Sequence, residues 1–422
     1  MQETAKGGSC SRLESANLSL SAKQIVAAIA DAARRWCDAD FPARVRSTRD
    51  IIARTGYREP VVDYALDSLF AGLDARTLRT TIASELGSTE ALDGFVAREG
   101  RPDVSFASAG LVAVVSSSTT IGVAIPALAY ALCAKSSVRV KDRSDFFVAA
   151  FAETVASERP ELAGRMQIEA WDSRDADAVP AFITEAGVVV AYGSDATLAA
   201  LRRALRSETR FIPYGNRTSV GYVAAETLGD TASAREAARG IAVDALLYDG
   251  EGCLSIHLVF VEREAVLDPK AFAKMLAEAC DEAAVEFPAG YTKLDPAAAA
   301  IRAAAFFRAA QGSGAVFGGN TAPHLVILDP PRDDVPPWAR RTIAVYGIDG
   351  PQDALGILRR HNIALEAVGT GSPASPVIEA FAIAAGASWI GRLGTLQRPP
   401  LGAEHGGVGR ILPFVRAIYR TC

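Results

Sequence analysis

The chain reads GLVAVVSSSTTIGVAIPALAYALCAKSSVRVK over residues 110–141. An apolar, β-branched run comes first, a turn rich in serine and threonine follows, and a longer apolar run leads into residues 137–141. The first run has the length of a buried strand, and the second run is long enough for a helix. The stretch therefore predicts a strand, a helix and a second strand, which is the βαβ unit of a parallel sheet.

The same alternation continues toward the C-terminus. Further strands are predicted at residues 166–171, 187–192, 209–214, 255–262, 324–329 and 342–346, with helical patterns between most of them. Before residue 100 the apolar spacing is helical instead, at 21–36, 61–73 and 78–86. We therefore expect an α/β protein with a helical N-terminal region (1–100), two α/β domains (101–214 and 215–388) and a C-terminal segment (389–422).

Composition excludes several classes of function. The chain has 422 residues and a net charge of −5, which gives no reason to expect a nucleic-acid partner. The six cysteines and four histidines show no metal-binding or disulfide spacing, so we expect no metal and a cytoplasmic location. Residues 104–134 carry no charge, but their serines, glycines and proline favour a buried strand and helix over a membrane span.

Cys253 is the sharpest local feature. It follows the turn Tyr248-Asp-Gly-Glu-Gly and precedes a strongly apolar strand. Glycine lets a backbone approach a ligand closely, and a cysteine at such a turn offers its own amide to an oxyanion. The alternative is that Cys253 only fills the core, as most free cysteines do.

Several stretches in this order resemble the aldehyde dehydrogenase superfamily. The resemblance is closest to the bacterial long-chain acyl-CoA reductases of the bioluminescence fatty-acid reductase type. It covers roughly residues 40–410. It is carried by Gly187–Leu201, by Arg210–Ser219 (RFIPYGNRTS), by the Cys253 segment and by Ile390–Leu401 (IGRLGTLQRPPL).

This resemblance implies an aldehyde-dehydrogenase-like fold with a parallel-sheet cofactor domain, an α/β catalytic domain and a C-terminal segment near the active site. It also implies that Cys253 attacks a fatty acyl thioester such as acyl-CoA, and that a nicotinamide cofactor then reduces the acyl group to an aldehyde. In the family a ligase can deliver the acyl group. The helical N-terminus is a candidate surface for a homo-oligomer.

The resemblance also implies cofactor and oxyanion residues. Ser118 and Thr119 stand where related reductases have a glycine–asparagine pair, and a hydroxyl of Thr119 can donate to an oxyanion. Lys141 matches the lysine that contacts the adenosine ribose, and Arg143 and Ser144 follow it. A cation suits a 2′-phosphate, so we expect NADPH rather than NADH.

Gly193 and Ser194 resemble the turn that packs on the cofactor, ahead of a helix whose N-terminus favours an anion. Asp195 is equally well explained as the cap of that helix. Asn216, Ser219 and His405 are weaker candidates for substrate contacts.

Aldehyde-oxidising relatives carry a glutamate base about 34 residues before the cysteine, and this position falls near Ser219. Its absence favours thioester chemistry over hydrolysis. Two alternatives stay open: another aldehyde or acyl-phosphate dehydrogenase of the superfamily, and a non-catalytic acyl-binding or scaffold subunit.

Overall fold

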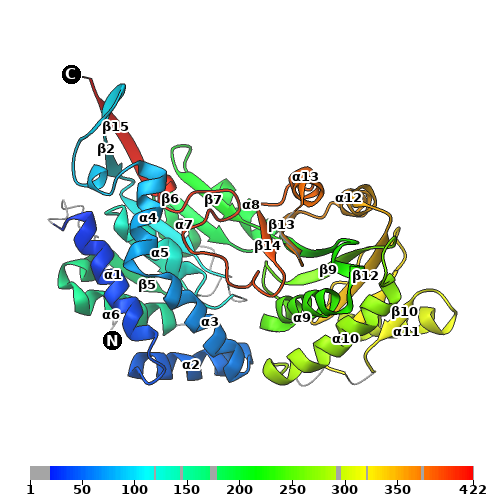
Figure 1. Ribbon diagram of the computed structural model, residues 1–422. Coiled ribbons are helices and arrows are strands. Elements are labelled where there is room, and N and C mark those ends of the chain that lie inside the picture. Colours follow the sequence, from blue (N-terminus) through cyan, green and yellow to red (C-terminus); the bar gives the residue numbers. More distant parts are fainter. Residues whose placement is uncertain are drawn as a thin grey trace, which may run out of the picture.

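The computed structural model describes residues 20–117, 120–142, 146–171, 178–290, 296–319, 322–371 and 375–421. Its element order is helical first, then two α/β regions, then a short segment that returns to both (Figure 1). Short 3₁₀ helices join the main elements: η1 (Glu90–Leu92), η2 (Pro160–Arg165), η3 (Thr227–Gly229), η4 (Leu247–Gly250) and η5 (Leu412–Phe414).

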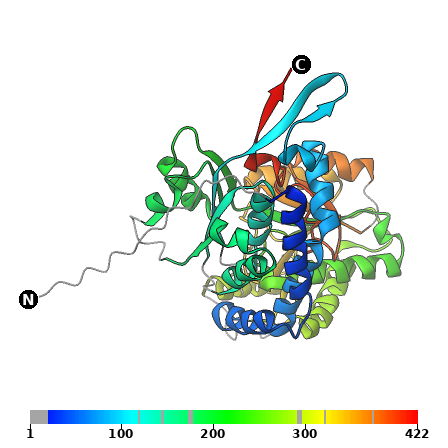
Figure 2. The same ribbon diagram turned by 90° about the vertical axis from the view of Figure 1, so that its left-hand side faces the viewer.

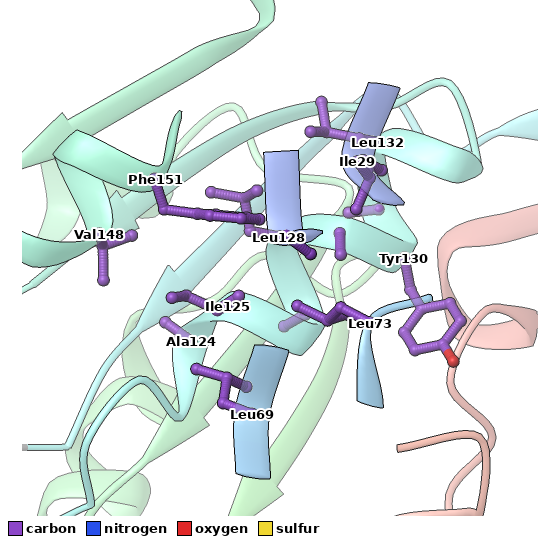
Figure 3. Packing of buried hydrophobic residues seen from close by; sticks show 14 of the residues in the cluster. Ile29, Leu69, Leu73, Ala124, Ile125, Leu128, Tyr130, Leu132, Val148 and Phe151 are labelled. Carbon is purple, nitrogen blue, oxygen red and sulfur yellow. The ribbon is translucent and has the colours of Figure 1, made fainter. Parts of the chain in front are cut away.

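The N-terminal helices form one layer against the first sheet region. They are α1 (Ala22–Trp36), α2 (Pro42–Thr55), α3 (Glu59–Gly72) and α4 (Ala75–Leu86). A capping box at Ser21 starts α1, whose apolar face is buried through to Trp36. Figure 3 shows Ile29 of α1 and Leu73, directly after α3, gathered with Leu128 in one apolar core. Burial of these faces holds the layer in place, since isolated helices of this length are marginal.

The first sheet has five parallel strands in the order β5-β4-β3-β6-β7. These are β3 (Leu111–Val115), β4 (Ser137–Lys141), β5 (Met166–Glu169), β6 (Val188–Tyr192) and β7 (Arg210–Tyr214). The helices α5 (Ala124–Cys133), α6 (Phe147–Glu158), α7 (Ala178–Ile183) and α8 (Asp195–Ala204) connect them. All residues of β4 and β6 are buried, as expected of strands covered on both faces. The expected parallel sheet is confirmed.

The second sheet has seven strands in the order β10-β11-β12-β9-β8-β13-β14. They are β8 (Thr218–Val223), β9 (Ile256–Glu262), β10 (Ala315–Phe317), β11 (Leu325–Leu328), β12 (Thr342–Ile348), β13 (Leu365–Thr370) and β14 (Trp389–Arg392). Every pairing is parallel except that of β10 with β11.

Helices cover both faces of this sheet (Figure 1). One layer holds α9 (Thr231–Leu246) and α10 (Pro269–Glu286), the other α12 (Pro351–Arg360) and α13 (Pro376–Ala384), and α11 (Pro296–Ala310) packs near β10.

A third, antiparallel sheet was not expected from the sequence. It pairs β1 (Val96–Arg98) and β15 (Val415–Arg420) with the two edges of β2 (Arg101–Ser108). Figure 2 shows this sheet projecting from the body of the molecule as an arm that carries the C-terminal strand. The residues from 101 therefore enter this arm before the parallel sheet begins at β3. Among the described residues, no helix is long and apolar enough to cross a bilayer.

Candidate active site

Two cavities meet at Cys253. The larger has a volume of about 1020 Å³ and lies between the two parallel sheets, where it is lined by Lys141, Gly193 and Asn216 among others. The smaller has a volume of about 150 Å³. The two cavities adjoin, because Cys253, Glu366 and His405 line both of them. The larger cavity lies at the carboxyl ends of β3, β4 and β6, where ligands of open parallel sheets bind.

A strained turn carries the cysteine. Tyr248 and Asp249 both have φ of 53°, and Gly250 follows with φ of 78°. Left-handed backbone is costly for residues other than glycine, so the surroundings must fix it. Asp249 accepts a hydrogen bond from Nε of Arg341 at 2.7 Å, and both side chains are buried. The amide of Arg341 also donates to the Asp249 carbonyl at 3.2 Å, which ties the turn to the start of β12.

Two further segments of the chain also stabilise this turn through hydrogen bonds. Ser219, which is fully buried on β8, donates from Oγ to the Cys253 carbonyl at 3.1 Å. Gln397 donates from Nε2 to Oγ of Ser255 at 3.2 Å and to the Asp244 carbonyl at 2.9 Å. Ser219 lines neither cavity, so its position favours support of the turn that carries Cys253 over contact with a substrate.

The resting thiol of Cys253 is neutral. Burial raises its pKa to about 11, and the nearby carboxylate of Glu366 acts in the same direction. Hydrogen bonds from the amides of Cys253 and Leu254 act in the opposite direction. Since the thiolate is the nucleophilic form, the thiol must lose its proton before it can attack a carbonyl. The other described cysteines lie away from the two cavities: Cys37 is exposed, and Cys133 and Cys280 are buried in the core.

Three stacked rings line the larger cavity. The ring centroids of Tyr192 and Tyr214 lie 4.8 Å apart, and those of Tyr214 and His405 lie 4.1 Å apart. Burial lowers the pKa of His405 to about 3, and the positive charges of Arg410 and Arg217 add to this effect. His405 therefore presents a neutral imidazole, and it lines both cavities. Through His405, residues of the C-terminal segment line both cavities.

Glu366 is a site residue that the sequence pattern did not single out. It lies on β13, lines both cavities, and has an oxygen 3.8 Å from Nε of Arg217. Burial raises the pKa of Glu366, while Arg217, the Gly406 amide and Arg410 lower it. The available signal was one acid in the short run Leu365-Glu-Ala-Val, which is otherwise apolar.

His257 and Trp338 complete the far wall of the larger cavity. Nε2 of His257 lies 2.7 Å from the Gly250 carbonyl, and its ring meets Trp338 edge-on at 5.0 Å. His257 therefore contacts the turn that carries Cys253. Trp338 lies in a proline-rich loop and carried no sequence signal of its own.

The described cofactor candidates line the larger cavity. Lys141 is only 3% exposed at the end of β4, with its ammonium 4.5 Å from the ring centre of Trp171. Ser194 caps α8 by accepting the Thr197 amide at 3.3 Å. Asp195 is therefore the first residue of α8 and not its cap, because the serine oxygen takes the free amide. A helix N-terminus behind Gly193 suits an anionic group.

Asn216 is exposed at the edge of the larger cavity, and its amide donates to Oδ1 of Asp195 at 3.4 Å. Ser118, Thr119, Arg143 and Ser144 lie outside the described residues, so their predicted roles stay predictions. Within the described ranges, no three His, Cys, Asp or Glu side chains gather as a metal site would require.

The fold is similar to that of aldehyde dehydrogenases. An NAD-dependent benzaldehyde dehydrogenase from Corynebacterium glutamicum matches with a TM-score of 0.67 and 17% identity, covering 95% of this chain and 86% of the other. An aldehyde dehydrogenase from Brucella melitensis biovar abortus 2308 matches with a TM-score of 0.68 and 13% identity, covering 95% and 85%. The indole-3-acetaldehyde dehydrogenase AldA of P. syringae gives 0.71 and 12%, covering 95% and 84%.

The family is narrower than the fold. Residues 17–417 match the model of the acyl-CoA reductase (LuxC) family, and the chain belongs to that family of oxidoreductases. The resemblance drawn from the sequence is thereby confirmed. A comparison with curated proteins found no match.

Proposed function

We propose that the protein reduces an acyl thioester, with acyl-CoA as the first candidate, to an aldehyde through an acyl intermediate on Cys253, using NADPH. The observation that carries the proposal is the place of Cys253 where a large cavity of mixed polarity adjoins a small, mainly apolar one. A thioester carbon seated on the sulfur would put its acyl chain in the smaller cavity and its thiol carrier in the larger.

The reaction on Cys253 consumes a thioester, a hydride and a proton. The Cys253 thiolate attacks the thioester carbonyl, the carbon–sulfur bond to the carrier breaks, and the carrier leaves as a thiol with the proton that Cys253 gave up. A nicotinamide, when bound, would supply the hydride that reduces the acyl carbon. The carbon–sulfur bond to Cys253 then breaks as the aldehyde forms, and a proton from solvent restores the neutral thiol. The amides of Cys253 and Leu254, which point toward the sulfur, favour its anionic form.

Residues of the larger cavity fit a dinucleotide. Ser194 and the N-terminus of α8 suit a pyrophosphate, and the buried cation of Lys141 suits a ribose or a 2′-phosphate. NADPH over NADH rests on Lys141 together with the predicted roles of Arg143 and Ser144. We also retain three predictions from the sequence: a ligase partner that transfers the acyl group, self-association through the helical N-terminus, and a cytoplasmic location.

A second candidate function is aldehyde oxidation by the same cysteine, and Glu366 favours it. This carboxylate borders both cavities, and its raised pKa suits a base that activates water. Its ion pair with Arg217 and its hydrogen bond from Gly406 favour a fixed, structural carboxylate instead. Ser219, not an acid, supports the cysteine from β8.

The test follows NADPH absorbance and thiol release with hexanoyl-CoA and tetradecanoyl-CoA. Wild type is compared with Cys253→Ser and with Cys37→Ser, which changes an exposed cysteine outside the site. We expect thiol release and NADPH oxidation in wild type and Cys37→Ser, and neither in Cys253→Ser. Aldehyde oxidation that Glu366→Gln abolishes would favour the second candidate. If neither thioester reduction nor aldehyde oxidation is detected, the result would favour a non-catalytic acyl-binding or scaffold subunit.

A further inference from the structure

The larger cavity has one wall from each of the two parallel-sheet regions. Lys141 and Ser194, the candidates for the dinucleotide, belong to the first sheet and its helices. The opposite wall comes from the second region, where the last turn of α12 and the residues that lead into β13 line the cavity. α12 and α13 pack against each other on one face of that sheet, and Ala384 and Ala385 at the end of α13 continue the wall (Figure 1). Neither helix carried a site candidate in the sequence.

Arg359 is an exposed cation on this wall. Within the parts of the chain that the structure describes, its guanidinium forms no hydrogen bond and no ion pair. The neighbouring arginines are both engaged. Arg360 pairs with Asp333 at 2.9 Å, and Nη1 of Arg217 donates to the Leu365 carbonyl at 3.2 Å. A cation in the last turn of α12 also offsets the helix dipole, but Arg360 does this without lining the cavity. Arg359 is thus placed to bind an anion that enters the cavity.

A short path joins Arg359 to Cys253. Residues 361–364 follow α12 and line the larger cavity, and Glu366, two residues on, borders both cavities together with Cys253. Asn362 takes the left-handed conformation, with φ of 50°, where the chain turns from α12 into β13. From Asn362 to Glu366 is four residues, which span at most about 14 Å when extended. Residues 361–364 contain no carboxylate, so this stretch adds no repulsion to an anion held by Arg359.

This arrangement fits a thiol that carries a phosphate at the far end of an extended arm. In the proposed reaction the thioester lies at Cys253, because its carbonyl is attacked there. A phosphate further along the arm then needs a cation at some distance from the cysteine, on the wall without the dinucleotide candidates. Arg359 meets both conditions, and a guanidinium binds a phosphate through charge-assisted hydrogen bonds.

We infer that Arg359 binds a phosphate of the thiol carrier, and that the arm of the carrier lies along residues 361–364. The inference rests on the proposed function and adds the binding site of the carrier and its chemical class, a phosphorylated thiol of the coenzyme A type. The carrier and the dinucleotide then use opposite walls of one cavity.

The experiment compares two carriers of the same acyl group in acylation of Cys253, which needs no nicotinamide. Octanoyl-CoA bears phosphates, whereas octanoyl-N-acetylcysteamine keeps only the thiol end of the arm and has none. Each is mixed with the full chain, and the mass increase on Cys253 is followed in quenched samples. We expect Arg359→Gln to lower the second-order rate constant for octanoyl-CoA about tenfold, because a charge-assisted contact is lost. The rate constant for octanoyl-N-acetylcysteamine should not change.

Two further variants and two further measurements sharpen the test. Arg360→Gln is the matched control, because Arg360 is the next residue of the same turn and lines neither cavity. It should change neither rate constant, while Arg359→Lys should retain part of the octanoyl-CoA rate, since it keeps the charge without the planar fork. Added potassium chloride should slow acylation by octanoyl-CoA more in wild type than in Arg359→Gln, because salt screens exposed charges. NADPH, followed by its fluorescence, should bind both proteins equally.

Three outcomes would overturn the inference and leave the proposed function intact. These are an equal loss with both carriers, no loss with octanoyl-CoA, and weaker NADPH binding in place of slower acylation, which would assign Arg359 to the dinucleotide. If neither thioester acylates Cys253 in wild type, the proposed function fails and the inference fails with it.

Discussion

The buried ion pair in the turn that carries Cys253 gives a prediction that stability measurements can test directly. Arg341 and Asp249 are both almost inaccessible to solvent, and Nε of Arg341 lies 2.7 Å from Oδ1 of Asp249. Arg341→Met keeps much of the side-chain volume but leaves the Asp249 carboxylate without its cation. Removing one partner of a buried pair costs about 3–5 kcal/mol of unfolding free energy.

In the Arg341→Met variant one further hydrogen bond is lost, and one hydrogen bond to Asp249 remains. Arg341 also donates to the Phe287 carbonyl at 2.7 Å, and that acceptor loses its partner in the variant. Asp249 keeps the amide of Gly290 at 3.1 Å, which relieves part of the cost. We therefore expect a loss of about 3 kcal/mol for Arg341→Met, and about half of that for Asp249→Asn combined with Arg341→Met.

The assay is urea unfolding followed by tryptophan fluorescence, with iodoacetamide labelling of Cys253 below the unfolding midpoint. The single variant should label faster, because a loosened turn exposes the sulfur. Arg340→Met is the control, since its guanidinium pairs with Glu251 in a half-exposed position worth about 1 kcal/mol or less. A loss below 1 kcal/mol for Arg341→Met, or a double variant no more stable than the single, would refute the reasoning.

Four further predictions concern protons and the helix cap. Alkylation of Cys253 should accelerate about tenfold per pH unit between pH 7 and 10, because its pKa is raised to about 11; a flat profile would contradict the buried neutral thiol. Glu366→Gln should make alkylation at pH 8 faster, because loss of the negative charge lowers the pKa of Cys253; an unchanged rate would show that the charge of Glu366 does not act on the Cys253 thiol. Ser194→Ala should weaken dinucleotide binding and cost about 1 kcal/mol of stability, as calorimetry would measure. Burial raises the pKa of Asp244 to about 7, above its ordinary value, so the folded state favours the protonated acid. Stability should therefore fall as pH rises from about 4 to about 7, and Asp244→Asn should remove that fall.

The parallel sheets were predictable because their strands are buried on both faces. Leu111–Val115 and Val188–Tyr192 are nearly continuous apolar runs, so the pattern indicates both their type and their burial. Strands Thr218–Val223 and Leu365–Thr370 went unpredicted, since each mixes polar residues or glycine into a short run. The arm strand Arg101–Ser108 is only partly buried and has no helix beside it to mark it.

The candidate site, too, was predictable only in part. The Cys253 turn was visible because its glycines and the following strand are neighbours in sequence. Glu366 and Trp338 were not, because they reach the cysteine only through pairing of strands far apart in the chain. The positive φ of Tyr248 and Asp249 left no signal either, since neither residue type predicts that conformation as glycine does.

The supports of the nucleophile turn come from segments spread over the chain, and this sets the timing of its assembly during synthesis. Ser219 is made before the cysteine, Arg341 well after it, and Gln397 near the end. Until residue 397 has left the ribosome, the turn lacks its last anchor and Cys253 lacks the wall that contains His405. The Cys253 turn is therefore completed among the last parts of the protein, so that a nascent or truncated chain carries the cysteine without the anchors of its turn.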